Sequence, residues 1–434
     1  MLRRFNLTLA FALLLSGTPV LARVIAIKAG KLVDPATGIV SNNQTILIDG
    51  AKIKAVGTSI PIPVGAQTID LSKLTVLPGL IDSHTHMCLG YRLYGTSPGA
   101  TNAQSIVQTS RSLLEAVFLA SIENTTGYRA LQGAANAKSM LEAGFTSIRD
   151  VGNAGNYADT DLRRAIEDGL VPGPTIINAG RIITPLGGQF PEILSPDRPG
   201  IGEPEYLYAD THDEMKKAIR QNILYGAKVI KIVVDDQPYL YSPEDIKFMV
   251  GEAGRAGLKV AAHCWTDKGA RNAAEGGLAS IEHGIHMTND TLSLAKQNNV
   301  VLDATPFTKE MATVMGAPQW HTEFVDLLRR AYKLGVPMAF GSDLDLEIPG
   351  HTRGEMAAAD VENYVEAGLP SQAVLQIWIT NGARLLGIDK ERGSIKPGMF
   401  ADIIATPQNP LDDIHALEHV TFVMKNGNVV KSVD

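Results

Sequence analysis

The chain has 434 residues, of which 45% are hydrophobic, 20% are charged and 41 are glycine. This composition is typical of a globular protein with many turns and excludes a disordered chain, and the length suits one large α/β barrel with a smaller appendage. The net charge of −7, without any Lys- or Arg-rich run, argues against a nucleic-acid partner.

The first 22 residues have the three parts of a secretory signal. Arg3 and Arg4 precede an apolar run from residue 7 to residue 15, and Val20-Leu21-Ala22 follows as a cleavage site. The apolar run is shorter than the roughly 20 residues that a membrane-spanning helix needs. We therefore expect removal of residues 1–22 and a periplasmic or secreted bacterial protein, with no membrane attachment after cleavage.

Both ends of the remaining chain show short apolar runs broken by turns. Near the N-terminus, two such runs flank Asp49-Gly50, a dipeptide that is typical of a tight β-hairpin. Asn426-Gly427 lies between two runs near the C-terminus. Because strands from opposite chain ends can pair, we predict one composite β-sandwich domain from residues 23–78 and 393–434.

Between these ends, strand-like runs alternate with segments of helical length, which indicates a parallel sheet with helical crossovers. Eight strands close a (β/α)8 TIM barrel, so we predict this α/β fold for residues 79–392. Ser-Pro-Glu at Ser242 predicts the start of a crossover helix over 242–256. The predicted strands are 75–83, 146–150, 175–179, 229–233, 259–262, 280–282, 300–304 and 337–341.

Two histidines near the end of the first predicted strand have i, i+2 spacing. Alternate residues of a strand point to the same side, so His84 and His86 can direct both imidazoles at one metal ion, although an isolated pair could arise by chance. Four further candidates lie in or at the ends of other predicted strands, whose carboxyl ends face one mouth in a barrel. They are Lys231, His263, His283 and Asp343.

A set of motifs spans the mature chain. The motifs are Pro78-Gly79-Leu80-Ile81-Asp82-Ser83-His84-Thr85-His86, Ile230-Lys231-Ile232, Ala262-His263, Ser280-Ile281-Glu282-His283-Gly284, Gly341-Ser342-Asp343, Gly393-Ser394-Ile395-Lys396-Pro397-Gly398 and Ala401-Asp402. In this order they resemble the amidohydrolase superfamily, in its imidazolonepropionase-like and prolidase-like, or Xaa-Pro dipeptidase-like, branch. The resemblance also favours a homo-oligomer.

The resemblance implies a binuclear metal centre, most often of zinc. By the family pattern, His84, His86 and Asp343 would hold the more buried ion. His263 and His283 would hold the other ion. Lys231 would react with CO2 to form a carbamate that bridges both ions, because an unmodified lysine offers no acceptor to a cation. Otherwise Lys231 would be a buried cation paired with a carboxylate.

The activity that the resemblance implies is hydrolysis of the C–N bond of a small amide or dipeptide, of the Xaa-Pro or N-acyl amino acid type. Two cations would lower the pKa of a bridging water, and the hydroxide would attack the amide carbonyl. Asp343 would be a ligand and also the base that passes the water's proton to the leaving amine. Cyclic amides, lactones and phosphotriesters are alternative substrates, and a metal-free binding scaffold is an alternative function.

The residues expected near the substrate depart from the family pattern. Trp265 stands where prolidase-like relatives often carry tyrosine, and its indole either donates a hydrogen bond or walls the pocket. Asp235 and Asp236 would either receive a cationic group of the substrate or cap the next helix. The loops 90–112 and 185–202 are expected to shape the pocket. The predicted substrate contacts are Trp265, Tyr239, Gln189 and His351.

Three further features of the sequence lie close to the predicted ligands. Glu282 and Asp82 would either orient imidazoles and backbone or form structural salt bridges. Arg149-Asp150 resembles another family feature, with no role assigned. An exported protein could join Cys88 and Cys264, but two cysteines are few for a disulfide framework, so we expect buried free thiols instead of a bridge.

Overall fold

The computed structural model describes six segments of the chain. They are residues 24–90, 120–189, 195–197, 200–236, 239–348 and 350–432. The predicted signal sequence, 1–22, lies outside the described residues, as do most of the loop 90–112 and part of the loop 185–202.

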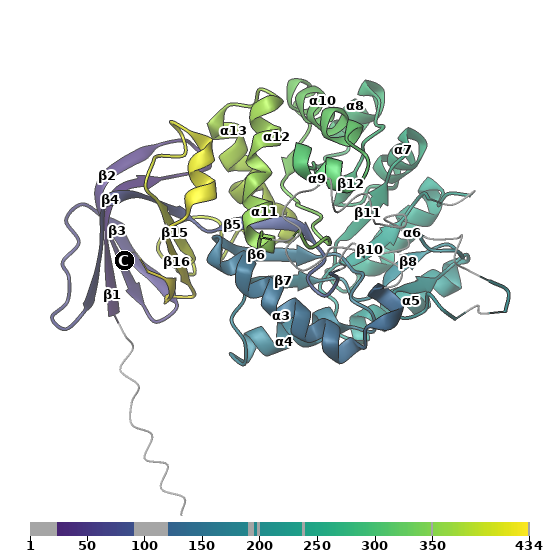
Figure 1. The fold of residues 1–434 in the computed structure, drawn as a ribbon, viewed down its shortest axis with the longest axis horizontal. Coiled ribbons are helices and arrows are strands. Elements are labelled where there is room, and N and C mark those ends of the chain that lie inside the picture. The colour runs from purple at the N-terminus through teal and green to yellow at the C-terminus, as the bar shows by residue number, and fades with distance from the viewer. Residues whose placement is uncertain are drawn as a thin grey trace, which may run out of the picture.

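Strands from both ends of the chain form one seven-stranded sheet (Figure 1). In spatial order they are β17 (Asn428–Lys431), β16 (Phe422–Lys425), β15 (Ile403–Thr406), β4 (Gln67–Pro78), β1 (Val24–Val33), β2 (Val40–Asp49) and β3 (Lys52–Gly57). β1 and β4 are parallel, and β15 pairs antiparallel with β4. This pairing joins the two chain ends, as the predicted composite domain requires, whereas the sandwich arrangement and the domain bounds stay predictions.

The two predicted turns lie against each other in this sheet. Asn426 and Gly427 have φ values of 49° and 74°, and Gly50 has 58°. A Cβ atom on Gly427 would lie 2.1 Å from the carbonyl oxygen of Gly50. The second turn therefore needs glycine both for its backbone conformation and for this close approach.

The eight strands predicted between the chain ends have counterparts in two parallel sheets. The first sheet consists of β5 (Leu80–Thr85), β6 (Phe145–Asp150) and β7 (Thr175–Asn178), in this order. The second consists, in spatial order, of β14 (Met338–Ala339), β13 (Val301–Asp303), β12 (Ser280–His283), β11 (Val260–Cys264), β10 (Ile230–Val233), β8 (Ile182–Thr184) and β9 (Tyr206–Tyr208). β8 and β9 were not predicted, because both are too short to show a periodic pattern.

The prediction of one strand over 75–83 was wrong, because β4 and β5 belong to different sheets and meet at Gly79. The N–H of Gly79 donates to the carbonyl of Asp402 at 3.1 Å. A Cβ atom on Gly79 would lie 2.1 Å from the hydroxyl of Thr146. The chain passes from one sheet to the other where a side chain would not fit.

Backbone hydrogen bonds connect the three-stranded sheet to the other parallel sheet at both edges. On one edge, the N–H of Ser83 donates to the carbonyl of Phe340 at 2.7 Å. On the other edge, the N–H of Lys228 donates to the carbonyl of Asn178 at 2.7 Å. Phe340 directly follows β14 and Lys228 lies just before β10, and both of these strands belong to the seven-stranded parallel sheet.

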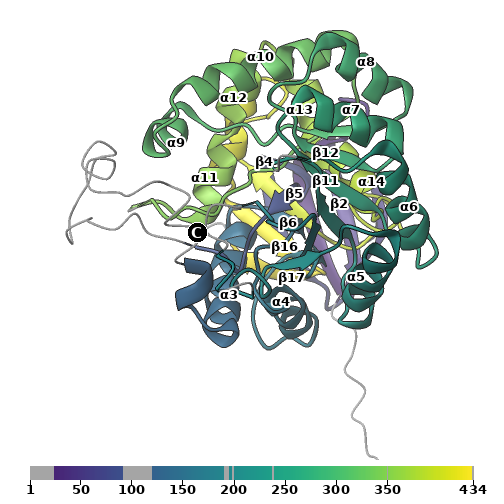
Figure 2. The same cartoon turned by 90° about the vertical axis from the view of Figure 1, so that its right-hand side faces the viewer.

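The helices that follow the parallel strands are α3 (Thr126–Glu142), α4 (Ala158–Glu167), α5 (His212–Leu224), α6 (Pro243–Gly254), α7 (Asp267–Gly276), α8 (Asn289–Gln297), α9 (Lys309–Val314), α10 (Gln319–Leu334), α11 (Arg353–Ala359), α12 (Val361–Glu366), α13 (Ser371–Leu375) and α14 (Gly382–Leu386), with the π-helix η2 (Gln376–Asn381). The 3-10 helix η3 (Ile414–His419) lies between β15 and β16. In Figure 2, α3 to α8 and α10 form an outer layer around the strands. The predicted cap is confirmed: Ser242 accepts from the N–H of Asp245 at 3.2 Å, and Pro243 opens α6.

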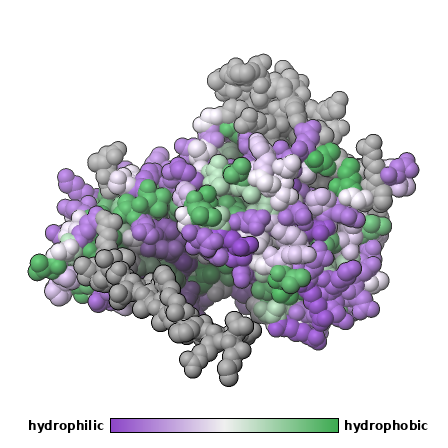
Figure 3. Space-filling model, turned by 90° about the horizontal axis from the view of Figure 1, so that it is seen from below, coloured by the Kyte–Doolittle hydropathy of each residue, from purple (hydrophilic) through white to green (hydrophobic). Residues whose placement is uncertain are grey.

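The face of the molecule in Figure 3 is mostly hydrophilic, with small groups of hydrophobic residues among the polar ones. Such scattered apolar groups are ordinary on a water-facing surface. Within the described segments, no helix has both the length and the apolar character needed to cross a membrane.

Candidate metal centre

The predicted ligands lie near the carboxyl ends of neighbouring parallel strands. The register aligns Val233 of β10 with His263 of β11, and Cys264 of β11 with His283 of β12. The N–H of Asp343, just after β14, donates to the carbonyl of His84 on β5 at 2.9 Å. Because these strands run in the same direction, their side chains meet at one edge.

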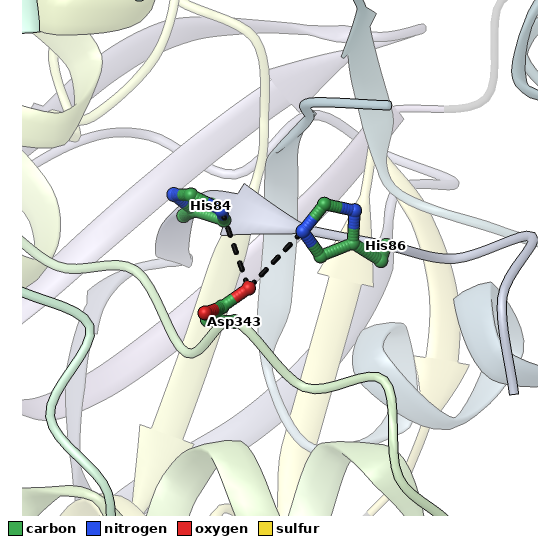
Figure 4. A group of neighbouring side chains, drawn as sticks. All are labelled: His84, His86 and Asp343. Carbon is green, nitrogen blue, oxygen red and sulfur yellow. Dashed lines mark ion pairs between the residues drawn. The ribbon is translucent and has the colours of Figure 1, made fainter. Parts of the chain in front are cut away.

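His84, His86 and Asp343 form one compact group (Figure 4). One carboxylate oxygen of Asp343 lies 3.3 Å from His84 Nε2 and 3.1 Å from His86 Nε2. The other ring nitrogens are held from behind, His84 Nδ1 by Glu282 at 2.7 Å and His86 Nδ1 by the carbonyl of Gly152 at 2.9 Å. Each Nε2 therefore faces the carboxylate, as in metal-binding histidines.

The other two histidines lie beside this group. The ring centroids of His263 and His283 are 4.6 Å apart, and those of His84 and His283 are 5.0 Å apart. His283 Nδ1 lies 2.7 Å from the Thr305 hydroxyl and 3.4 Å from the second carboxylate oxygen of Asp343. His84 and His86 thus contact one carboxylate oxygen of Asp343 and His283 the other, while His263 lies next to His283.

Two of these residues hold a strained backbone. His283 has a φ of 66° and Asp343 a φ of 52°, both in the left-handed region. For residues other than glycine this conformation costs about 1–3 kcal/mol and is concentrated at functional sites. His283 ends β12 and Asp343 follows β14, so the strained backbone lies where each side chain is directed toward the common edge.

Lys231 is 2% exposed, and its amine nitrogen has no hydrogen-bond partner among the described residues. Burial lowers the pKa of this amine, although the charges of Glu282 and Asp343 act in the opposite direction. A desolvated lysine with a lowered pKa is more often the neutral, nucleophilic amine. That form is the one that can react with CO2.

The side chains present fit divalent metal ions. Within the described segments, His84 Nε2 and His263 Nε2 are buried without a hydrogen-bond partner, as is the Lys231 amine. Burial raises the pKa of the Asp343 carboxyl, but His84 and His283 outweigh it and hold this pKa well below its ordinary value. Neutral imidazoles and an ionised carboxylate are the ligands that zinc and similar ions prefer.

Arg149, to which no role was assigned from the sequence, binds Glu282, the residue that holds the His84 ring. It is 1% exposed and donates to Ser280 at 2.9 Å, to both oxygens of Glu282 at 2.9 Å and to Asp303 at 3.3 Å. Burial raises the pKa of Glu282, but Arg149 and His84 hold it well below its ordinary value. Glu282 therefore forms a buried salt bridge and orients an imidazole at the same time.

Asp82 and Asp150 hold backbone near the same edge. One oxygen of Asp82 accepts from the N–H groups of His84 and Ser342, each at 3.1 Å, which ties β5 to the segment after β14. Asp150 accepts from the N–H of Met87 at 2.6 Å. Burial raises the pKa of Asp82 to about 7. Asp82 thus orients backbone instead of an imidazole.

A model of the Amidohydrolase family matches residues 75–431. The chain belongs to this family. The matched segment contains every predicted metal ligand, and the match confirms the superfamily that the motifs indicated.

Three known proteins illustrate the similarity of this amidohydrolase to others. Ochratoxinase of Aspergillus niger is 28% identical, over 94% of this chain and 87% of that protein. Imidazolonepropionase of Porphyromonas gingivalis is 23% identical, over 84% of this chain and 83% of that protein. The solved structure of a Xaa-Pro dipeptidase with methionine bound in its active site is 28% identical, with a TM-score of 0.78 over 94% of this chain and 99% of that chain.

Trp265 of this amidohydrolase packs against a predicted ligand. Its indole stacks on the His283 ring, with centroids 5.6 Å apart and planes 10° apart. It also contacts the rings of Trp320 at 5.2 Å and Phe324 at 6.4 Å. This aromatic packing favours the role of a pocket wall.

The two acids after β10 have different surroundings. Asp235 is buried and accepts from the N–H of Trp265 at 2.9 Å and from the N–H and hydroxyl of Thr266, each at 2.8 Å. Since Thr266 is the N-cap of α7, Asp235 secures the start of that helix. Asp236 instead has an oxygen 2.6 Å from His263 Nε2.

Gln189 contacts His263, one of the predicted metal ligands. Its amide nitrogen lies 3.4 Å from His263 Nδ1, and its amide oxygen accepts from the Tyr206 hydroxyl at 3.4 Å. Gln189 therefore lies behind the His263 ring, on the side away from Nε2. Its predicted contact with substrate stays a prediction.

Tyr239 and His351 lie in loops around the site. Tyr239 is 49% exposed, and its hydroxyl donates to the carbonyl of Leu186 at 2.7 Å, which ties two loops together. His351 is exposed and lines a cavity of about 70 Å³ with Phe307 and Leu344. Leu344 directly follows Asp343 in the chain, but none of the predicted ligands lines this cavity.

Two groups that contact Nδ1 of a predicted ligand were not predicted, namely Thr305 beside His283 and the carbonyl of Gly152 beside His86. Thr305 follows β13, so its place after a parallel strand was a usable signal. A backbone carbonyl has no residue signature. Cys88 and Cys264 are buried free thiols, as expected.

Proposed function

We propose that this protein is a metal-dependent hydrolase that cleaves the C–N bond of a small amide or dipeptide. The observation that carries the proposal is the convergence of four histidines and Asp343 at one edge of the parallel strands, with the buried amine of Lys231 on the same strands. Membership in the Amidohydrolase family and the enzyme relatives support a hydrolase.

The proposed fold is a closed (β/α)8 barrel that carries a smaller β-sandwich domain. The backbone hydrogen bonds at both edges of the three-stranded sheet support closure. Barrel enzymes place their active sites at the carboxyl ends of the strands. The predicted ligands lie at these ends.

The proposed cofactors are two divalent ions, with zinc as the expected metal. When bound, such ions polarise a carbonyl oxygen and lower the pKa of water, which supplies a nucleophile at neutral pH. The proposed ligands are His84, His86 and Asp343 for one ion, His263 and His283 for the other, and carboxylated Lys231 for both.

The chain's own residues supply orientation and proton transfer. Asp343 is ionised, so it can accept the proton of the attacking water and pass it to the leaving nitrogen. Glu282 holds the His84 ring, and Trp265 covers the His283 ring and excludes water from that side. Amines leave poorly, so proton delivery matters as much as attack.

The proposed substrate is a Xaa-Pro dipeptide or an N-acyl amino acid. The 28% identical Xaa-Pro dipeptidase, with methionine bound in its active site, supports this class. A hydrolysis screen of the zinc-loaded protein tests it, with dipeptides, N-acyl amino acids, cyclic amides, lactones and phosphotriesters. We expect the highest kcat/KM with the first two. A preference for another class would reassign the substrate, and full metal loading without turnover would indicate a binding scaffold.

The proposal extends to a periplasmic or secreted homo-oligomer. The signal-like pattern of residues 1–22 supports export. Expression of the full sequence in a bacterium tests this proposal. The mass of the exported protein, measured by mass spectrometry, should correspond to the chain without residues 1–22. Sedimentation of the purified protein tests the oligomeric state.

A further inference from the structure

The loop after β10 is fixed against the end of β11. The N–H of Val234 donates to the carbonyl of His263 at 3.1 Å, and Asp235 binds the backbone of Trp265 and Thr266. Gly269 leaves room for this arrangement, since a Cβ atom there would lie 2.2 Å from the Asp235 carboxylate. The position of the next residue, Asp236, is therefore set by its neighbours.

Asp236 holds its carboxylate beside His263 in a strained conformation. Its φ is 82°, in the left-handed region that disfavours side chains other than glycine's. One carboxylate oxygen lies 2.6 Å from His263 Nε2, yet this buried nitrogen makes no hydrogen bond with any described residue. The two atoms are close without the alignment of a donor and an acceptor, so the Nε2 atom of His263 remains without a hydrogen-bond partner in this contact.

The surroundings indicate which partner this is. The His263 side chain is 4% exposed, its Nδ1 faces Gln189, and its Nε2 lies on the side of Asp236. His283 is the neighbouring ring, at 4.6 Å between centroids. The Asp236 side chain is 23% exposed, so burial does not force it against His263. A buried imidazole nitrogen and an anionic oxygen are both ligand types that bind a divalent cation, and a small outward turn of the partly exposed Asp236 side chain would admit an ion between them.

We propose that Asp236 is a further carboxylate ligand of the metal ion at His263 and His283. The proposal rests on the proposed function and adds a ligand to it. Asp235 and Asp236 then divide two tasks, since Asp235 fixes the loop and Asp236 binds the ion. The added negative charge strengthens binding of the second ion.

Metal affinity tests the proposal independently of turnover. Zn²⁺ binding to the full chain is measured by competition with a chromophoric chelator, and the absorption spectrum of the Co²⁺-loaded protein reports the ligand set. Asp236→Asn should weaken the second ion at least about tenfold, the lower end of the effect of a lost supporting group, and change the Co²⁺ spectrum. Asp236→Glu should restore part of the affinity. Asp210→Asn, which removes an exposed acid from the nearby loops, should bind as the wild type does.

A simple ion pair between Asp236 and His263 predicts the opposite result. Asp236→Asn would then remove a competitor of the metal, so that affinity for the second ion would be unchanged or higher and the Co²⁺ spectrum would not change. That outcome overturns the proposal while the proposed function stands. A wild-type protein that binds no metal overturns both. Thermal unfolding of the metal-free variants shows that each is folded.

Discussion

Glu282 lies 2.7 Å from His84 Nδ1, and both side chains are fully buried. Arg149 and His84 keep the pKa of Glu282 well below its ordinary value, so Glu282 is an ionised acceptor. The proton between them therefore resides on Nδ1 of His84. This fixes the tautomer in which Nε2 carries a lone pair toward Asp343, as a metal ligand requires.

Glu282→Gln should therefore weaken metal binding by about 10–100-fold, because the amide can present a donor to Nδ1 and leave the ring free to turn. Chelator competition measures this affinity. Glu142→Gln, an exposed acid paired with Lys138, is the matched control and should not change it. Unchanged affinity in Glu282→Gln would show that this carboxylate serves only the Arg149 salt bridge.

Asp343→Asn should bind metal but lower kcat by about 10²–10⁴-fold, because one proton-transfer role contributes about this much. Steady-state kinetics and metal analysis of the same sample measure the two effects. Turnover close to that of the wild type would place the base elsewhere.

Lys231→Ala should lose metal and activity together, because the bridging carbamate cannot form. Short carboxylic acids such as acetate and propionate should restore part of the activity by occupying the place of the bridge. Lys231→Met, which keeps the side-chain length without the amine, should show the same loss. Full activity in either variant would rule out the carbamate.

Lys425 predicts how stability depends on pH. It contacts Asp402 and Thr175, at 2.8 and 2.7 Å, and burial lowers its pKa from 10.5 to about 8. Between these values the unfolded chain binds more protons than the folded one, so the contribution of Lys425 to the free energy of unfolding rises with pH.

Denaturation at several pH values, with Lys425→Met as the reference, measures this contribution. The free energy of unfolding of the wild type relative to the variant should rise between pH 8 and pH 10.5, by at most about 3.5 kcal/mol, since one pKa unit corresponds to about 1.4 kcal/mol. A flat or falling difference would show that burial does not lower the pKa of Lys425 in the folded protein.

The sequence predicted the parts of the molecule that follow from local patterns. The i, i+2 spacing of His84 and His86 and the apolar runs before His263 and His283 were sufficient to place these histidines near strand ends. Turn dipeptides such as Asn426-Gly427 were found because their backbone requirement is visible in the residue type.

The remaining features depend on contacts between distant segments. The break at Gly79 follows from the nearness of Thr146. The role of Asp235 follows from the backbone of Thr266, and that of Arg149 from its salt bridges with Glu282 and Asp303. No local pattern distinguishes such residues from ordinary loop acids or strand cations.

The dependence of hydrolysis on metal tests the central claim most directly. The measurement is turnover of a Xaa-Pro dipeptide or an N-acyl amino acid by the purified protein after chelator treatment and during titration with zinc. We predict loss of turnover on chelation and recovery that saturates at two zinc ions per chain. Full turnover by the metal-free protein would contradict the account.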